Sequence, residues 1–131
     1  MKLNSLIPIG ILIIVIVTSG CISGQSADSS PEMDAFAQCI KDSGIEMYGS
    51  VTCKFCTRQK EMFGSSFERI GEIECHPGGH NPQTELCLEK GIELTPTWIL
   101  ERDGVEVARL EGIQDFETLA EVTGCPLPVS E

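Results

Sequence analysis

The stretch from Cys53 to Cys56, with two residues between the cysteines, constrains this chain more than any other. It lies between an apolar run, Ile45 to Val51, that predicts a strand and a polar run, Thr57 to Phe67, that predicts a helix. Two cysteines spaced in this way at a helix start can close a disulfide with little backbone movement. The start of a helix also favours a thiolate, because its free N–H groups and dipole stabilise negative charge. The pattern therefore indicates thiol–disulfide exchange.

The composition leaves room for one folded domain of about 100 residues and a leader. The 131 residues are 41% hydrophobic, which suffices for a packed core. With 9 basic and 20 acidic residues, the formal charge is −11. This balance argues against binding nucleic acid or anionic lipid through the folded surface, because such binding needs clustered Lys and Arg side chains that displace counterions.

The first 21 residues predict a leader. Lys2 precedes an apolar stretch from Leu6 to Val17, which is shorter than the roughly 20 residues of a membrane span and fits a signal peptide. The run from Thr18 to Cys21 resembles a lipobox, in which Cys21 receives a lipid after cleavage. Without cleavage the leader could act as a short anchor, and a cleaved and released protein is the third possibility. Each version places the domain outside the cytoplasm.

Residues 22–31 are rich in serine and predict a flexible tether that holds the domain, residues 32–131, in the cell envelope. Beyond Cys21 the chain has six cysteines: Cys39, Cys53, Cys56, Cys75, Cys87 and Cys125. Outside the cytoplasm, this number favours disulfides over metal ligation. Their spacing alone does not decide how they pair.

Capping and turn residues divide the domain into helices and strands. Pro31 starts a first helix that ends at Gly44, and Asp103-Gly104 predicts a hairpin turn. The expected strands are Ile45–Gly49, Ile70–Cys75, Thr97–Glu101 and Val105–Leu110, and the later helices are one from the cysteine pair to about Gly64, Thr84–Lys90, and Phe116–Val122 capped by Asp115. The order αβαβαββα predicts an α/β fold with a mixed central sheet flanked by helices.

Several motifs, in their order along the chain, resemble those of one known family. They are Met47 to Gly49, Cys53 to Cys56, Gln59 to Gly64, Glu74-Cys75, Asn81 to Cys87 and Pro96 to Ile99. Through them the chain from about Met33 to Cys125 is similar to the thioredoxin-like domain associated with vitamin K epoxide reductase homologues. The resemblance implies a thioredoxin fold and a dithiol site. It also implies exchange of disulfides with secreted proteins and with a quinone-linked membrane enzyme of the vitamin K epoxide reductase type.

The resemblance extends to one pair of structural cysteines. It implies that Cys75 pairs with Cys87 across the loop that separates them. Cys39 and Cys125 lie outside the shared motifs, at the two ends of the domain, and we expect them to form a further structural disulfide. The redox-active group is then the Cys53–Cys56 disulfide, and we expect neither a cofactor nor a metal.

The chain departs from the family's common pattern beside the cysteines. Thr52 stands where an aromatic residue is common, and Lys54-Phe55 stands where Pro-His is common. Phe55 cannot stabilise a thiolate as a histidine would. Related thioredoxins often bury an acidic residue beneath the cysteines, whereas counting along the strand puts Met47 at that place and turns Glu46 to the other face.

These observations assign roles to four residues. Cys53, at the helix start, is expected to be the exposed sulfur that attacks, and Cys56, one turn further, the buried sulfur that resolves the mixed disulfide. We expect Pro96 to follow a cis peptide bond and to face the cysteines, where its missing N–H removes a competing donor. Thr95 then offers its backbone groups to an extended substrate strand.

Two other classes of function stay open on the sequence alone. A zinc or copper site could draw on soft ligands from one set: Cys53, Cys56, Cys75, His76, His80 and Cys87. Against it, no second CxxC flanks the loop that holds the histidines, which we expect to be exposed. The other class is a binding lipoprotein that is stapled by disulfides and has no catalytic activity.

Overall fold

The structure is a computed structural model that describes residues 29–129. The leader, Cys21 and the tether up to residue 28 lie outside the described residues, so the predictions made for them stay predictions. None of the helices in the described part is long and apolar enough to cross a membrane.

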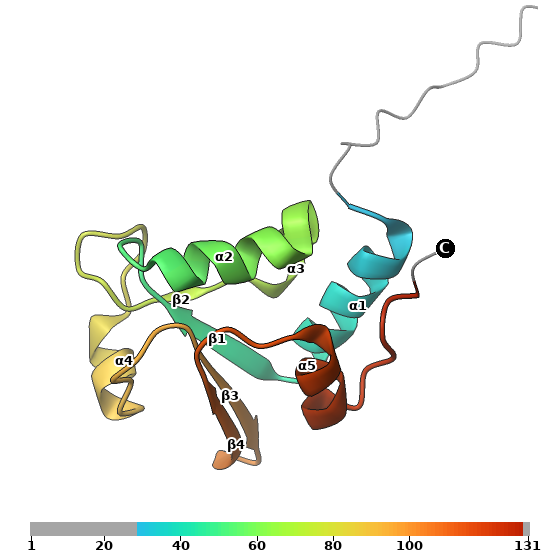
Figure 1. Ribbon diagram of the computed structural model, residues 1–131. Helices are drawn as coiled ribbons and strands as arrows, with labels where there is room; N and C mark the ends of the chain where they lie inside the picture. Colours follow the sequence, from blue (N-terminus) through green and yellow to red (C-terminus); the bar gives the residue numbers. More distant parts are fainter. Residues whose placement is uncertain (1–28, 130–131) are drawn as a thin grey trace, which may run out of the picture.

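Helices and strands follow one another along residues 29–129 in the predicted order, except that a 3-10 turn and a short helix come between the second helix and the second strand (Figure 1). They are α1 (Pro31–Asp42), β1 (Ile45–Gly49), α2 (Lys54–Phe63), η1 (Gly64–Ser66), α3 (Phe67–Ile70), β2 (Ile73–Glu74), α4 (Thr84–Glu89), β3 (Thr97–Arg102), β4 (Val105–Glu111) and α5 (Phe116–Thr123). Local chemistry explains several of these bounds. Ser30 caps α1 by accepting the N–H of Met33, and Asp115 caps α5 by accepting the N–H of Thr118.

The four strands form one mixed sheet in the order β2-β1-β3-β4. Strand β1 runs parallel to β2 and antiparallel to β3, with Met47 opposite Trp98. Strands β3 and β4 form an antiparallel hairpin whose turn residues, Asp103 and Gly104, both have positive φ, as a type I′ hairpin turn requires. This topology confirms the predicted α/β thioredoxin fold with a mixed central sheet.

The main core fills one face of the sheet, where α1, α2, α3 and α5 pack against β1 and β3. Phe63 on α2 is its aromatic centre, with ring centroids 5.0 to 6.4 Å from those of Phe36, Phe67, Trp98 and Phe116. Met47 is buried on this face and Glu46 is exposed on the other, as predicted from the alternation of the strand. The core therefore fixes α2, and with it the cysteine pair, above β1 and β3.

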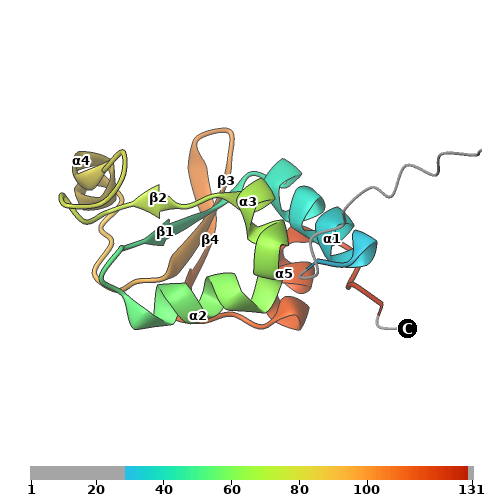
Figure 2. The same cartoon turned by 90° about the horizontal axis from the view of Figure 1, so that it is seen from above.

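Helix α4 covers the opposite face. It lies apart from the other helices in both views (Figures 1 and 2). A smaller buried cluster joins it to the sheet through Tyr48, Cys87 and Ile99. A disulfide between Cys75 and Cys87, with an S–S distance of 2.03 Å, ties the start of the loop after β2 to α4. Helices thus lie on both faces of the sheet, as predicted, but four helices cover one face and α4 alone covers the other.

The strand predicted for Ile70–Cys75 is wrong at both ends, since only Ile73 and Glu74 pair with β1. Ile70 instead ends α3 and its side chain is buried in the main core. Gly71 then leaves the helix with a φ of 76°, so extended backbone begins only after it. The alternation of apolar residues that suggested a longer strand includes one residue that faces the core from a helix.

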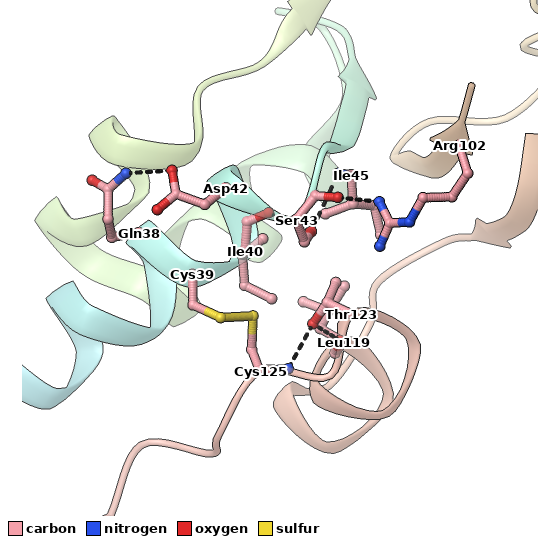
Figure 3. The surroundings of a disulfide bond; sticks show 10 residues. All are labelled: Gln38, Cys39, Ile40, Asp42, Ser43, Ile45, Arg102, Leu119, Thr123 and Cys125. Atoms are coloured by element: carbon pink, nitrogen blue, oxygen red, sulfur yellow. Dashed lines mark hydrogen bonds between the residues drawn. A yellow bond between two sulfur atoms is a disulfide. The ribbon is translucent and has the colours of Figure 1, made fainter. Parts of the chain in front are cut away.

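A second disulfide links the N-terminal and C-terminal parts of the domain (Figure 3). It joins Cys39 on α1 to Cys125, just after α5, with an S–S distance of 2.07 Å and a sequence separation of 86 residues. Cys125 is buried and packs with Ile40 and Leu119 in the main core. The disulfide thus holds the first and last helices against each other, on the side of the domain away from α4.

Removing this long crosslink should destabilise the protein more than removing the short one. In the chain-entropy model, the Cys39→Ala/Cys125→Ala double variant loses about 4–5 kcal/mol of unfolding free energy, whereas Cys75→Ala/Cys87→Ala loses about 3 kcal/mol. Denaturant unfolding of both variants, with the Cys53–Cys56 pair oxidised throughout, measures the difference. Equal losses, or the reverse order, would contradict this role for the long crosslink.

Candidate active site

Cys53 and Cys56 stand at the start of α2 as free thiols. Cys53 is the N-cap residue of the helix, with an extended backbone, and its Sγ accepts the backbone N–H of Cys56 at 3.1 Å. The sulfur thus takes the place that a Ser or Asp oxygen has in an ordinary N-cap. Cys53 is half-buried, while Cys56 is fully buried beneath it. The Cys53 sulfur is therefore accessible to another molecule, whereas the Cys56 sulfur is shielded from solvent.

The loop before β3 faces this helix start. The Cys53 thiol donates to the backbone carbonyl of Thr95, with Sγ 3.2 Å from the oxygen. The Thr95–Pro96 peptide bond is cis, and Pro96 is buried. The buried hydroxyl of Thr97 donates to the carbonyl of Leu94 at 2.7 Å and fixes the turn. The structure therefore brings Thr95 directly against Cys53, with Pro96 next to it in the chain.

The surroundings of the two sulfurs shift their pKa values in opposite directions. Burial, the largest influence, acts to raise the pKa of Cys53, but the side chains of Cys56 and Thr95 and the backbone N–H groups of Cys56 and Phe55 outweigh it and lower this pKa. Burial is also the largest influence on Cys56, and together with the hydrogen bond to the Cys53 sulfur it raises the pKa of this thiol. The first sulfur to ionise is the accessible one.

Glu74 anchors the loop that leads into the cysteines. Its side chain is buried, and one carboxylate oxygen accepts the backbone N–H of Val51 at 3.1 Å and that of His76 at 2.7 Å. Two loops, one before α2 and one after β2, are thereby joined through a single side chain. Sequence reasoning used Glu74 only as part of a family motif. An acidic residue at the end of a buried strand was the signal that it missed.

Gln59 is a second polar residue that the sequence analysis used only as part of a family motif. It lies on α2, three residues after Cys56, and is fully buried. Its carboxamide contacts the backbone of Gln114, in the loop between β4 and α5. The signal in the sequence is the helix period, because Gln59 shares a face with Cys56 and Phe63 and is the polar residue on that buried face.

An apolar groove lies beside the cysteines. It has a volume of about 510 Å³ and is lined by Phe55, Leu94, Thr95, Glu111, Gly112 and Ile113. Phe55 and Leu94 are 64% and 56% exposed, which is unusual for large apolar side chains. Thr95 lines the groove, and its carbonyl oxygen accepts a hydrogen bond from the Cys53 thiol, so the groove lies one residue away from the accessible sulfur.

The other predicted site residues lie apart from the dithiol. Cys75 and Cys87 share a disulfide, which removes two ligands from the metal set considered above. His76 and His80 lie in a loop whose residues are mostly exposed; His80 is itself exposed, whereas His76 is half-buried and its Nδ1 accepts the N–H of Gly78. Within residues 29–129, no three His, Cys, Asp or Glu side chains come together as a metal site would need.

The chain is similar in sequence to a curated thiol-disulfide oxidoreductase. It is 38% identical over 106 residues to the thiol-disulfide oxidoreductase LTO1 of Arabidopsis thaliana. The match covers 78% of this chain and 27% of the relative, so the chain spans about a quarter of that protein's length. No protein-family model matches the chain.

Solved thioredoxin structures superpose on the chain at low identity. Thioredoxin f from spinach chloroplast gives a TM-score of 0.47 at 17% identity, covering 65% of this chain and 80% of that one. Thioredoxin NaTrxh from Nicotiana alata gives 0.45 at 16% identity, covering 66% and 76%. The assignment of the fold follows from the order and directions of the four strands in the sheet.

The pKa directions predict how the two thiols react as the pH changes. A lowered pKa leaves more of Cys53 as thiolate at neutral pH, so its alkylation should reach half its maximum rate below about pH 8.5, the value of a free cysteine. Cys56, with a raised pKa, should be alkylated only at higher pH. Alkylation of the reduced protein at graded pH, with each cysteine read by mass spectrometry, measures both. A half-maximum for Cys53 at or above that of free cysteine would contradict the assigned direction.

Proposed function

We propose that this protein is a thiol–disulfide oxidoreductase that exchanges disulfides through Cys53 and Cys56. The observation that carries the proposal is the N-cap bond, in which the accessible Cys53 sulfur accepts the Cys56 N–H above a fully buried second thiol. A structural disulfide needs no such difference in access between its two sulfurs. The similarity to a thiol-disulfide oxidoreductase over most of the chain supports the same reaction.

In the oxidising direction, a client thiolate attacks Cys53 Sγ and breaks the Cys53–Cys56 bond. The electron pair of that bond goes to Cys56, which takes up a proton because its pKa is raised. A second client thiolate then attacks the client sulfur of the mixed disulfide and releases Cys53 as a thiolate, the form that its lowered pKa favours. The client loses two electrons and gains one disulfide, while the protein gains two electrons and holds a dithiol.

The reduced protein needs an electron acceptor to act again. We assign this role to a separate membrane enzyme of the vitamin K epoxide reductase type, which would accept the two electrons through its own disulfide and pass them to a quinone. The motif resemblance along Met33 to Cys125 supports this partner. The apolar leader with Cys21 supports a domain held at the outer face of the cytoplasmic membrane, with secreted proteins as clients.

Equilibration of the full chain in graded glutathione buffers tests the proposed reaction. After alkylation, mass spectrometry should find that Cys53 and Cys56 change state together at a defined potential, while Cys39, Cys75, Cys87 and Cys125 stay oxidised. A midpoint above that of the glutathione couple identifies an oxidant of clients, and one below it a reductant. If Cys53 and Cys56 do not titrate as a separate pair, the proposed function is wrong.

A further inference from the structure

Gln59 links the helix of the cysteines to one wall of the apolar groove. Its Nε2 donates to the carbonyl of Gln114 at 3.0 Å, and its Oε1 accepts the N–H of Gln114 at 2.7 Å. The carboxamide thus pairs with the Gln114 backbone in the way that one strand pairs with another. Trp98 Nε1 also donates to Gln59 Oε1, at 3.4 Å. A fully buried amide with these partners has one allowed position, because any shift would leave a buried polar group unpaired.

The loop that Gln59 holds is the far wall of the groove. Gly112 and Ile113, which line it, immediately precede Gln114. The loop is also bonded to the segment that follows Leu94 and Thr95, since the N–H of Gly112 donates to the carbonyl of Pro96 at 2.8 Å. Gly112 has a φ of 85°, so the chain turns sharply between these two attachments. The distance from Phe55 on α2 to Ile113 is therefore set through Gln59, which belongs to the same helix as Phe55.

We propose that Gln59 is a positioning residue for client binding: it sets the width of the groove that takes an apolar side chain next to the client's reacting cysteine. This inference rests on the proposed function. The client is a polypeptide, because Thr95, which lines the groove, offers backbone groups beside Cys53. Its neighbouring side chain is apolar, because Phe55, Leu94 and Ile113 supply the apolar surface of the groove. Gln59 itself touches neither the client nor the sulfurs.

The role is distinct from that of an ordinary core residue. Gln59 could be replaced by an apolar side chain of similar length, and the core face of α2 would still pack through Phe63 and Cys56. What such a change removes is the link to Gln114, so its effect should fall on the groove. Binding of an apolar client residue should weaken, whereas the chemistry at Cys53, which depends on the α2 start and Thr95, should persist.

The test compares two disulfide substrates on the full-length protein. One is glutathione disulfide, which has no apolar side chain beside its cysteine. The other is a disulfide-bonded peptide with leucine next to each cysteine. In Gln59→Met, KM for the peptide should rise about tenfold while kcat stays within about twofold, the pattern of lost binding common to ground and transition states. The rate with glutathione disulfide should also stay within about twofold of the unchanged protein.

Two further variants guard against a merely structural effect. Ile40→Val shortens a buried side chain on α1 and serves as the matched control, because it loosens the core away from the groove. Gln114→Ala removes side-chain bonds to the carbonyls of Glu111 and Gly112, at 3.0 and 3.2 Å, without touching the core. It should raise the peptide KM in the same direction, though less. Ile40→Val should leave KM unchanged.

The outcomes separate the two proposals. If the unchanged protein fails to react with glutathione disulfide, the proposed function is wrong and the role of Gln59 falls with it. If it reacts, and KM for the peptide is unchanged in Gln59→Met and Gln114→Ala, only the role of Gln59 is wrong. An equal rise of KM in Ile40→Val, or an equal loss of rate with both substrates in Gln59→Met, would also overturn it. If Gln59→Met does not fold, the test uses the other two variants. The role of Gln59 then requires that the peptide KM rise in Gln114→Ala and stay unchanged in Ile40→Val.

Discussion

The hydrogen bond from the Cys56 backbone N–H to Cys53 Sγ is the interaction on which the rest of the site depends. It makes one sulfur the cap of α2, where the helix start offers N–H groups that nothing within the helix can satisfy. The two cysteines also differ in access and in pKa, because the cap residue is half-buried and the residue one turn further is fully buried. Thiol–disulfide exchange needs this asymmetry, with one sulfur to attack and one to resolve.

The remaining structure holds that helix start in place against two loops. Phe63 and the main core fix the body of α2 over the sheet, and two buried polar side chains fix the loops around its first turn. The Glu74 carboxylate accepts hydrogen bonds from the backbone N–H groups of Val51 and His76, and the Gln59 carboxamide accepts one from the backbone N–H of Gln114. Buried polar groups that are paired in this way hold a single arrangement, since a displaced loop would leave N–H groups without acceptors. The disulfides crosslink the domain outside this centre.

Local chemistry made much of the fold predictable from the sequence. Pro31, Gly64 and Asp115 mark helix ends, and Asp103-Gly104 marks the hairpin, because each acts on its immediate neighbours. Strand alternation placed Met47 and Glu46 on opposite faces for the same reason. The sequence also pointed to the cysteines and to the Thr95–Pro96 turn within reach of them.

The residues that support the site were harder to predict. Gln59 bonds to a backbone 55 residues away and Glu74 to one 23 residues away, and no periodicity in the sequence specifies such partners. The end of α3 at Ile70 was missed because a short apolar run has the same pattern in a buried helix turn as in a strand. The groove depends on three segments that meet only in the folded chain, so its lining could not be read from any one of them.

Capture of mixed disulfides in cells tests the central claim, that Cys53 attacks and Cys56 resolves, most directly. A Cys56→Ser variant of the full chain should accumulate disulfide-linked complexes with client proteins, and every linkage mapped by mass spectrometry should involve Cys53. The matched Cys53→Ser variant should accumulate few or none, because its remaining thiol is buried. If the folded Cys56→Ser protein forms no mixed disulfides, or if Cys56 traps clients as readily as Cys53, the account of this site is wrong.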